Sequence, residues 1–329
     1  MKNHLVRVFF YVFVATIGIS ATNAQPASTP TQREEVALPI IVLDPNGIPV
    51  SDLSKDRVKI FLDRVPQQIT RFSQNEAPCS VVILLDISYS MRNNLQDIQG
   101  HLIEFLQNSN PVNEYSLIAF GSTSQSLVDW TKDTQHIVSG VKGINLKTLP
   151  KSTKLFDACL LALEKLQDRV DSKRVLFLIT DAQEDRSIHR YEEIRRLCLA
   201  NQITVLCAFF ANGTSQTLLS SSKGQELIND LTNASGGVTY FVADKRDIGD
   251  PRFTNLKEKN YLDDLTNSLK ALAGYLRFQY LLTFLPGGVK GDVRIHKLQV
   301  SITAPSNPAK EMKELRVRYV GLIPPSKNK

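Results

Sequence analysis

The sequence predicts an α/β protein: a doubly wound, mostly parallel sheet inserted between the N- and C-terminal strands of a small antiparallel β-sandwich. Between residues 80 and 275, continuous apolar runs alternate with helical patterns, as in parallel sheets whose strands are buried on both faces. Three short β patterns precede this region and three follow it. Neither set can enclose a core alone, so we expect the two sets to pair with each other.

The first β patterns are short and are separated by turn residues, Asp-Pro-Asn-Gly at 44–47 and Asp-Arg-Val-Pro at 63–66. They cover residues 38–43, 58–62 and 68–72. The α/β region then opens with an apolar strand at 81–85 and a helix at 95–106, whose apolar residues recur at helical spacing.

The same alternation continues to residue 276. It predicts strands at 115–120, 126–130, 175–179, 203–210 and 238–242, and helices at 156–166, 188–200, 226–232 and 262–276. We expect the strand at 126–130 to be an antiparallel edge partner. The last β patterns cover residues 278–284, 297–302 and 315–319.

The first residues are typical of a secretory signal peptide, because Lys2 and Arg7 flank a short apolar run that ends in small residues. A transmembrane anchor is the alternative, but the run at 8–19 is shorter than the ~20 apolar residues that span a bilayer. We therefore expect cleavage after Ala24, no membrane span afterwards, and an exported protein that is secreted or periplasmic. The predicted order is signal peptide 1–24, flexible leader 25–36, N-terminal β segment 37–77, α/β domain 78–276, C-terminal β segment 277–322 pairing with 37–77, and tail 323–329.

Composition indicates a globular protein, with 329 residues, 42% hydrophobic and 22% charged. The net charge of +6 falls to +4 without Lys2 and Arg7, which is too small an excess to indicate a nucleic-acid partner. The four cysteines show no metal-binding spacing. We expect buried free thiols, although export would permit a disulfide and four cysteines allow three pairings. They are Cys79, Cys159, Cys198 and Cys207.

Five oxygen-bearing side chains lie where this fold would place loops at one edge of the sheet. Asp86, Ser88 and Ser90 follow the strand at 81–85, Thr153 precedes a helix, and Asp181 follows the strand at 175–179. Loops at the carboxyl ends of parallel strands converge at the topological switch point, where ligands bind. Hydroxyl and carboxylate oxygens suit a hard divalent cation.

These stretches resemble the metal ion-dependent adhesion site of von Willebrand factor A domains, which have a Rossmann-like fold, and the resemblance covers residues 80–275. It rests on Asp86-Ile87-Ser88-Tyr89-Ser90, Ser152-Thr153 and Thr180-Asp181. It implies that the Ser88 and Ser90 hydroxyls bind the metal, that Thr153 binds directly or through water, and that Asp86 and Asp181 act mostly through waters. The implied ion is Mg²⁺, with Mn²⁺ or Ca²⁺ as alternatives.

Two positions depart from the family pattern: Lys151-Ser152-Thr153 stands where Gly-Gly-Thr is common, and Ala182 replaces the usual glycine. The outer segments are similar to those of the exported acidobacterial-type VWFA-related proteins. That similarity lies in residues 42–50, 63–72 and 277–286.

Four neighbours are candidates for the rim or for contacts behind the ligands. Tyr89 would belong to the contact surface. Asp157 could orient a ligand or stabilise the first turn of its own helix. Glu184 and Asp185 could approach the metal or remain exposed loop acids.

The donor set favours a binding protein over an enzyme, because three neutral hydroxyls leave a magnesium-like ion with charge to attract an anion. We expect a protein partner, in adhesion or a scaffold, that supplies an Asp or Glu carboxylate. Two alternatives remain open: a structural envelope or assembly component in which the ion is a staple, and a metal-assisted hydrolase. The sequence has no nucleophile elbow, phosphate loop or His-Glu-x-x-His motif.

Overall fold

The computed structural model describes residues 35–43, 49–75, 78–107, 109–169, 173–211, 218–243, 258–277, 279–287, 296–302, 316–318 and 322–323. The predicted signal peptide lies outside these residues, as do most of the leader and all of the tail but its first residue. Val36, predicted as the end of the leader, already belongs to the first strand.

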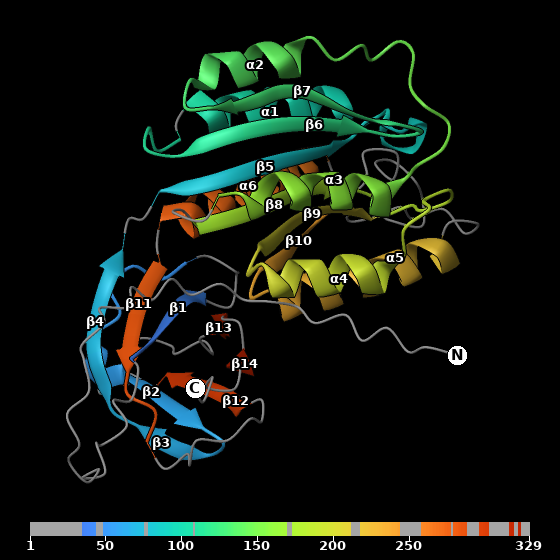
Figure 1. Ribbon diagram of the computed structural model, residues 1–329. Coiled ribbons are helices and arrows are strands. Elements are labelled where there is room, and N and C mark those ends of the chain that lie inside the picture. The colour runs from blue at the N-terminus through green and yellow to red at the C-terminus, as the bar shows by residue number, and fades with distance from the viewer. Residues whose placement is uncertain are drawn as a thin grey trace, which may run out of the picture. The chain divides into compact units, whose positions relative to one another are not determined.

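A six-stranded sheet forms the centre of the α/β part, in the order β10-β9-β8-β5-β6-β7 (Figure 1). All neighbouring strands are parallel except β6 and β7, which confirms the predicted antiparallel edge. The strands are β5 (Cys79–Asp86), β6 (Glu114–Phe120), β7 (Ser124–Thr131), β8 (Lys173–Thr180), β9 (Thr204–Ala211) and β10 (Val238–Ala243).

The central strand β5 is buried along its whole length because it has helices on both sides. Val81, Ile83 and Leu85 belong to one hydrophobic core, and Val82 and Leu84 belong to the other. Each such side chain contributes about 1.5–3 kcal/mol when fully buried. The unbroken apolar run in the sequence thus follows from a strand packed on both faces.

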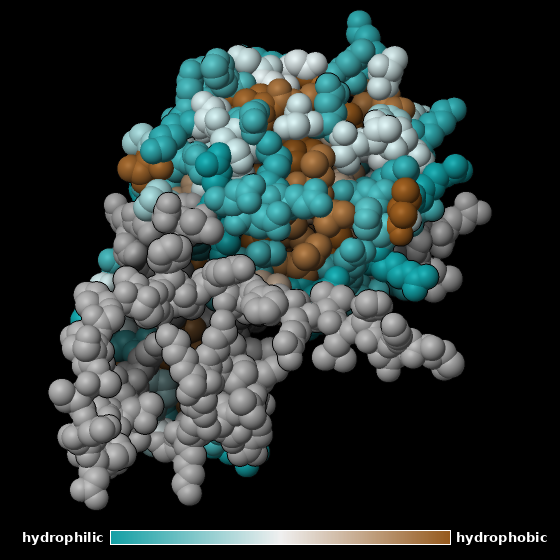
Figure 2. All heavy atoms as spheres, in the orientation of Figure 1, coloured by the Kyte–Doolittle hydropathy of each residue, from teal (hydrophilic) through white to brown (hydrophobic). Residues whose placement is uncertain are grey.

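Helices α1 (Leu95–Gln107), α2 (Thr134–Lys142) and α6 (Glu258–Arg277) supply the first core. Helices α3 (Leu155–Gln167), α4 (Tyr191–Ala200) and α5 (Leu218–Ala234) cover the other face. On the face shown in Figure 2, hydrophobic residues gather over α3 between flanks of hydrophilic ones. Partly buried residues that pack against this second core include Trp130, Phe156, Leu160, Leu161, Tyr191 and Leu197.

Four helices differ from the sequence prediction, among them α6, which starts at Glu258 rather than at 262. Helix α2 was not expected; its N-terminus is capped by Asp133, whose Oδ1 accepts the Gln135 N–H at 2.9 Å. Helix α5 starts at Leu218, well before residue 226. Helix α4 begins at Tyr191 rather than at 188. The predicted start of α4 was wrong because Ile188 lies in the loop before the helix, where its N–H donates to Asp157. The apolar side chain of Ile188 is 81% exposed in that loop.

The remaining strands form two four-stranded antiparallel sheets, in the orders β13-β1-β11-β4 and β14-β12-β2-β3. Strand β1 pairs with β11 and β2 pairs with β12, so each sheet joins the two ends of the chain. This confirms the predicted insertion. The strands are β1 (Val36–Leu43), β2 (Val58–Leu62), β3 (Val65–Gln67), β4 (Ile69–Asn75), β11 (Gln279–Phe284), β12 (His296–Ile302), β13 (Arg316–Arg318) and β14 (Leu322–Ile323).

The sandwich core is also built from both halves of the chain, for example from Ile40 and Ile60 on one side and Leu282 and Leu298 on the other. Tyr280 ties the halves together: its hydroxyl accepts the Leu53 N–H at 2.9 Å and donates to the Val50 carbonyl at 3.0 Å. The strand predicted at 68–72 corresponds to β4. It is preceded by β3, which was not predicted and which lies in the other four-stranded sheet.

Among the described helices, none combines the length and the apolar character needed to cross a bilayer.

Candidate metal centre

Asp86 is the last residue of β5, and its side chain is completely buried. Its Oδ1 accepts the Ser88 N–H at 2.8 Å, which forms a tight turn immediately after the strand. Its Oδ2 accepts the Thr180 hydroxyl at 2.7 Å. These two bonds fix the carboxylate at the point where β5 and β8 end side by side.

The two predicted serine ligands lie next to each other just beyond this turn. Ser88 has an extended backbone (φ −64°, ψ 160°) and precedes the short 3₁₀ helix η2 (Tyr89–Met91). The Ser88 and Ser90 Oγ atoms are 3.0 Å apart, so both hydroxyls face one point. Met91 is buried and anchors the turn from below.

Hydrogen bonds between loops bring Thr153 and Asp181 to the same edge of the sheet. The Tyr89 N–H donates to the Pro150 carbonyl at 2.7 Å, which joins the η2 turn to the loop that contains Thr153. The Asp185 N–H donates to the Thr153 carbonyl at 3.1 Å, which joins that loop to the one that starts with Asp181. Both Thr153 and Asp181 are buried.

Asp86 and Asp181 interact strongly enough to change the charge state of the site. Burial and then the negative charge of Asp181 raise the pKa of Asp86 from 3.8 to about 7, against hydrogen bonds from Ser88 and Thr180 that lower it. Among the described side chains, no positively charged one contributes to this shift. Buried carboxylates are normally compensated by a cation, so the donor set fits a divalent ion.

Thr180 is a site residue to which the sequence analysis gave no role, although it belongs to one of the stretches that carry the family resemblance. Its Oγ1 donates to Asp86 and accepts the Ala182 N–H at 2.9 Å, so one buried hydroxyl orients both the carboxylate and the following loop. The signal was available, because Thr180 is the one polar residue at the end of the apolar run Val175–Ile179 and directly precedes Asp181.

Ala182 adopts the left-handed backbone conformation, with φ of 54°. This conformation favours glycine, the residue common at this position in the resembling family, and costs another residue about 1–2 kcal/mol. The bond from its N–H to Thr180 and the burial of its side chain hold it there. These contacts hold the loop in the left-handed conformation although the residue is not glycine.

The acidic neighbours fasten the loop at 181–190 to helix α3. Glu184 Oε2 and Ser187 Oγ both accept the Phe156 N–H, at 3.1 and 3.0 Å, and so cap a helix that has no capping side chain of its own. Asp185 Oδ1 accepts the Thr153 N–H at 2.9 Å. Through this contact, Asp185 positions the backbone of a predicted ligand.

Asp157 holds the far end of the same loop. Its Oδ1 accepts the N–H groups of Ile188 and His189, each at 3.0 Å, and lies 2.8 Å from His189 Nδ1. These bonds lower the pKa of Asp157 against the effect of burial. Tyr89 lies on the rim, 52% exposed, with the Arg92 guanidinium 4.2 Å above its ring.

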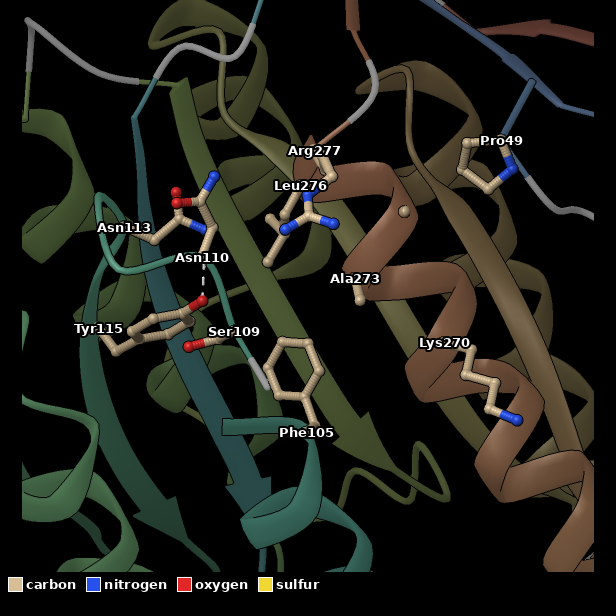
Figure 3. Close-up of a pocket in the computed structure, with 11 residues that line it drawn as sticks. Pro49, Phe105, Ser109, Asn110, Asn113, Tyr115, Lys270, Ala273, Leu276 and Arg277 are labelled. Atoms are coloured by element: carbon tan, nitrogen blue, oxygen red, sulfur yellow. Dashed lines mark hydrogen bonds between the residues drawn. The ribbon is translucent and has the colours of Figure 1, made fainter. Parts of the chain in front are cut away.

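A second feature lies at the opposite end of the sheet. A cavity of about 230 Å³ lies near the amino ends of β5 and β6, next to the C-terminal part of α6 (Figure 3). At its edge, Asn113 Nδ2 donates to the Tyr115 hydroxyl at 3.3 Å. The five candidate ligands lie at the carboxyl ends of the strands, so this cavity does not belong to the metal site.

Other metal chemistries find less support in the described part of the chain. No group of three or more His, Cys, Asp or Glu side chains there could hold an ion. The four cysteines are buried and free, which is the state expected from the sequence. Burial raises the pKa of Cys198 to about 12 and that of Cys207 well above 9, which keeps both as thiols.

Fold and site together give an α/β domain with buried and partly buried oxygen-bearing side chains at the carboxyl ends of its central strands. A sequence model of the von Willebrand factor type A domain matches residues 81–183, a range that contains all five candidate ligands. The chain thus contains a von Willebrand factor type A domain, and the match supports a metal-dependent protein-interaction module. Among curated proteins, none matches the chain.

Several solved structures are similar at low identity. BatB from Bacteroides thetaiotaomicron is 16% identical with a TM-score of 0.42, covering 58% of this chain and 99% of that one. An aerotolerance-related membrane protein from Bacteroides fragilis is 15% identical with a TM-score of 0.41, covering 50% and 91%. Proximal thread matrix protein 1 from the mussel byssus, in a structure with a zinc-occupied MIDAS motif, is 13% identical with a TM-score of 0.45. The match covers 64% of this chain and about half (48%) of that protein.

Proposed function

We propose that the protein is an exported protein-binding module, acting in adhesion or as a scaffold, in which a magnesium-like ion accepts an Asp or Glu carboxylate from a partner. Ser88, Ser90 and Thr153 would hold the ion through their hydroxyls, and Asp86 and Asp181 would act mostly through waters. When bound, the ion supplies a positively charged acceptor for an anionic oxygen.

One observation supports this proposal: two buried carboxylates, Asp86 and Asp181, lie at the carboxyl ends of the neighbouring strands β5 and β8, and the Asp86 carboxyl has its pKa raised to about 7. The Ser88 and Ser90 hydroxyls lie 3.0 Å apart directly after Asp86, and hydrogen bonds join the Thr153 loop to the loops of Tyr89 and Asp185. The carboxylates supply the negative charge that attracts a cation. The hydroxyls add no charge of their own, so an ion held by them keeps charge for a further anion.

The rim leaves room for a partner on one side of the site. Ser90 is only half-buried and Tyr89 is 52% exposed, whereas the other predicted ligands are buried. A partner carboxylate that reached Ser90 would contact Tyr89, and the fixed loops behind it would not have to move. Pre-organisation of this kind reduces the entropic cost of binding.

The test is a metal-dependent pull-down from the envelope fraction of the producing cell, in Mg²⁺ and in a chelator. We expect a partner that is captured by the wild type in Mg²⁺ only and is lost with Ser88→Ala. Ser126→Ala, which removes an exposed hydroxyl on β7, is the matched control and should bind normally. A partner captured equally in chelator, or equally by Ser88→Ala, would contradict the proposal.

Thermal melts separate binding from a purely structural role of the ion. A staple would raise the melting temperature strongly in Mg²⁺ alone, and Ser88→Ala would remove that increase without affecting any partner. A binding site would instead give its largest metal effect on capture of the partner.

A further inference from the structure

Each of the three loops that form the metal site carries an exposed positive side chain. Arg92 lies two residues after Ser90, and Lys151 lies two residues before Thr153. Arg186 lies in the loop that begins with Asp181. We call these three the basic collar: Arg92, Lys151 and Arg186.

Backbone bonds hold the collar loops next to one another. The bond from the Tyr89 N–H to the Pro150 carbonyl, at 2.7 Å, joins the loops that carry Arg92 and Lys151. The bond from the Asp185 N–H to the Thr153 carbonyl, at 3.1 Å, joins the loops that carry Lys151 and Arg186. The three loops that carry the collar residues therefore lie next to one another.

The acidic residues of the same loops are engaged within the protein. Glu184 Oε1 accepts the N–H groups of Arg186 and Ser187, at 3.0 and 2.7 Å, and its Oε2 caps α3. Asp185 is bonded to the Thr153 backbone. Within the described residues, no collar side chain takes part in an ion pair. The Arg92 guanidinium donates to the Tyr89 carbonyl at 3.0 Å and lies over the Tyr89 ring, and it keeps its full charge there.

Charges arranged in this way favour one kind of occupant. Glu184 and Asp185 hold the loops through backbone hydrogen bonds, while the three collar residues on the same loops are exposed. Exposed apolar side chains lie on two of these loops, Tyr89 at 52% and Ile188 at 81% exposure. A segment with one carboxylate at the ion, others near the collar and an apolar residue beside them would match all of these groups.

We propose that the partner presents its metal-binding carboxylate within an acidic segment, in which further Asp or Glu side chains lie against Arg92, Lys151 and Arg186. This inference rests on the proposed function, because it specifies the partner of the same site. Exposed charge pairs add little affinity each, but a field of one sign accelerates encounter and selects against uncharged partners.

The experiment compares how the protein, used as the whole chain, binds two fluorescent peptides. Each peptide is presented in many copies on beads. Both carry one central glutamate and one leucine; the flanking residues are aspartates in one peptide and asparagines in the other. Binding is measured in Mg²⁺ and in chelator, at low and high salt. A single-stranded DNA oligonucleotide serves as an anion without carboxylates.

Two triple variants test the collar. One is Arg92→Ala with Lys151→Ala and Arg186→Ala. The other removes three exposed lysines outside the metal-site loops: Lys59→Ala, Lys132→Ala and Lys270→Ala. Titration with Mg²⁺ alone, followed by calorimetry, shows that each variant still binds the ion.

We expect the acidic peptide to bind in Mg²⁺ about tenfold more tightly than the neutral one at low salt, because electrostatic attraction between a charged surface and a ligand of opposite charge has at least this size. The preference should disappear at high salt and in the collar variant, and remain in the control variant. Equal, metal-dependent binding of both peptides would overturn this inference alone, as would a preference kept by the collar variant. Stronger, metal-independent binding of DNA would also overturn it. If Mg²⁺ binds but neither peptide shows metal-dependent binding, the proposed function fails.

Discussion

Replacing Asp86 by asparagine should abolish metal binding and, at the same time, make the metal-free protein more stable. Asp86 is fully buried, and burial together with the charge of Asp181 raises its pKa from 3.8 to about 7. At 1.36 kcal/mol per pKa unit, this difference lowers the free energy of unfolding by about 4 kcal/mol when the carboxyl is ionised. The pKa of Asp86 is higher in the folded than in the unfolded state. The contribution of Asp86 to the free energy of unfolding of the wild type therefore falls as the pH rises from about 4 to about 7.

Asparagine removes this charge and keeps part of the hydrogen bonding. Its side-chain oxygen can still accept the Ser88 N–H, now 2.8 Å from Asp86 Oδ1. The bond that Thr180 donates to an ionised oxygen is lost, at a cost of about 1.5–3 kcal/mol. The balance is a gain of about 2 kcal/mol for Asp86→Asn in the absence of metal above pH 7.

Urea unfolding in chelator and in Mg²⁺, above pH 7, measures this balance, and calorimetry measures metal binding. Asp168→Asn, which changes an exposed aspartate at the end of α3, should alter neither quantity. Wild type should gain stability from Mg²⁺, and Asp86→Asn should not. If Asp86→Asn is less stable than wild type in chelator, the carboxylate is compensated within the protein and the reasoning about a cation site is wrong.

Three further changes test the structure around the site. Glu184→Ala removes one of the two acceptors that cap α3 and the partner of the other, Ser187, and should cost about 1–2 kcal/mol in urea unfolding and weaken Mg²⁺ binding. Glu192→Ala, on the exposed face of α4, should do neither. Gly224→Ala would place a Cβ 2.3 Å from the Ala182 carbonyl oxygen. It should lower the free energy of unfolding by about 1–3 kcal/mol and weaken Mg²⁺ binding in calorimetry. A Cβ at Gly100 meets nothing within 4 Å, so the control Gly100→Ala should stabilise α1. Ile41 packs in the α/β core and Ile40 packs in the sandwich core. The fluorescence of the single tryptophan, Trp130, reports unfolding of the α/β domain, so Ile41→Ala should lower its midpoint more than Ile40→Ala does. Equal shifts would mean that the two parts unfold as one unit.

Much of the fold could be predicted because burial leaves a direct pattern in the sequence. Strand β5 is apolar at every position from Val81 to Leu85, and that pattern requires packing on both faces. The pairing of the outer strands followed from unburied faces alone, and the antiparallel pairs β1–β11 and β2–β12 confirm it. Helix α2 was missed although Ile137, Val138 and Val141 occur at helical spacing after the capping residue Asp133.

The parts of the site that could not be predicted depend on contacts between distant segments. Glu184 and Asp185 looked like acids near a metal, yet their oxygens accept backbone N–H groups from residues about thirty positions earlier. Periodicity along the chain contains no information about such bonds. Ile188 was assigned to α4 for the same reason: its apolar side chain fitted the helical pattern, and only Asp157, 31 residues away, shows that its N–H is used elsewhere.

The connections to the sandwich enter the α/β domain at the end opposite the metal site. Cys79 and Lys173, the first residues of β5 and β8, bond to the carbonyls of Leu276 and Tyr275 at the end of α6, through Sγ at 3.3 Å and Nζ at 2.9 Å. Asp86, the last residue of the eight-residue strand β5, lies roughly 23 Å further along it, at about 3.3 Å per residue. A partner at the metal loops can therefore bind without disturbing these two connections. The ends of α6, β5 and β8 are thus joined to each other at the end of the sheet opposite the metal loops.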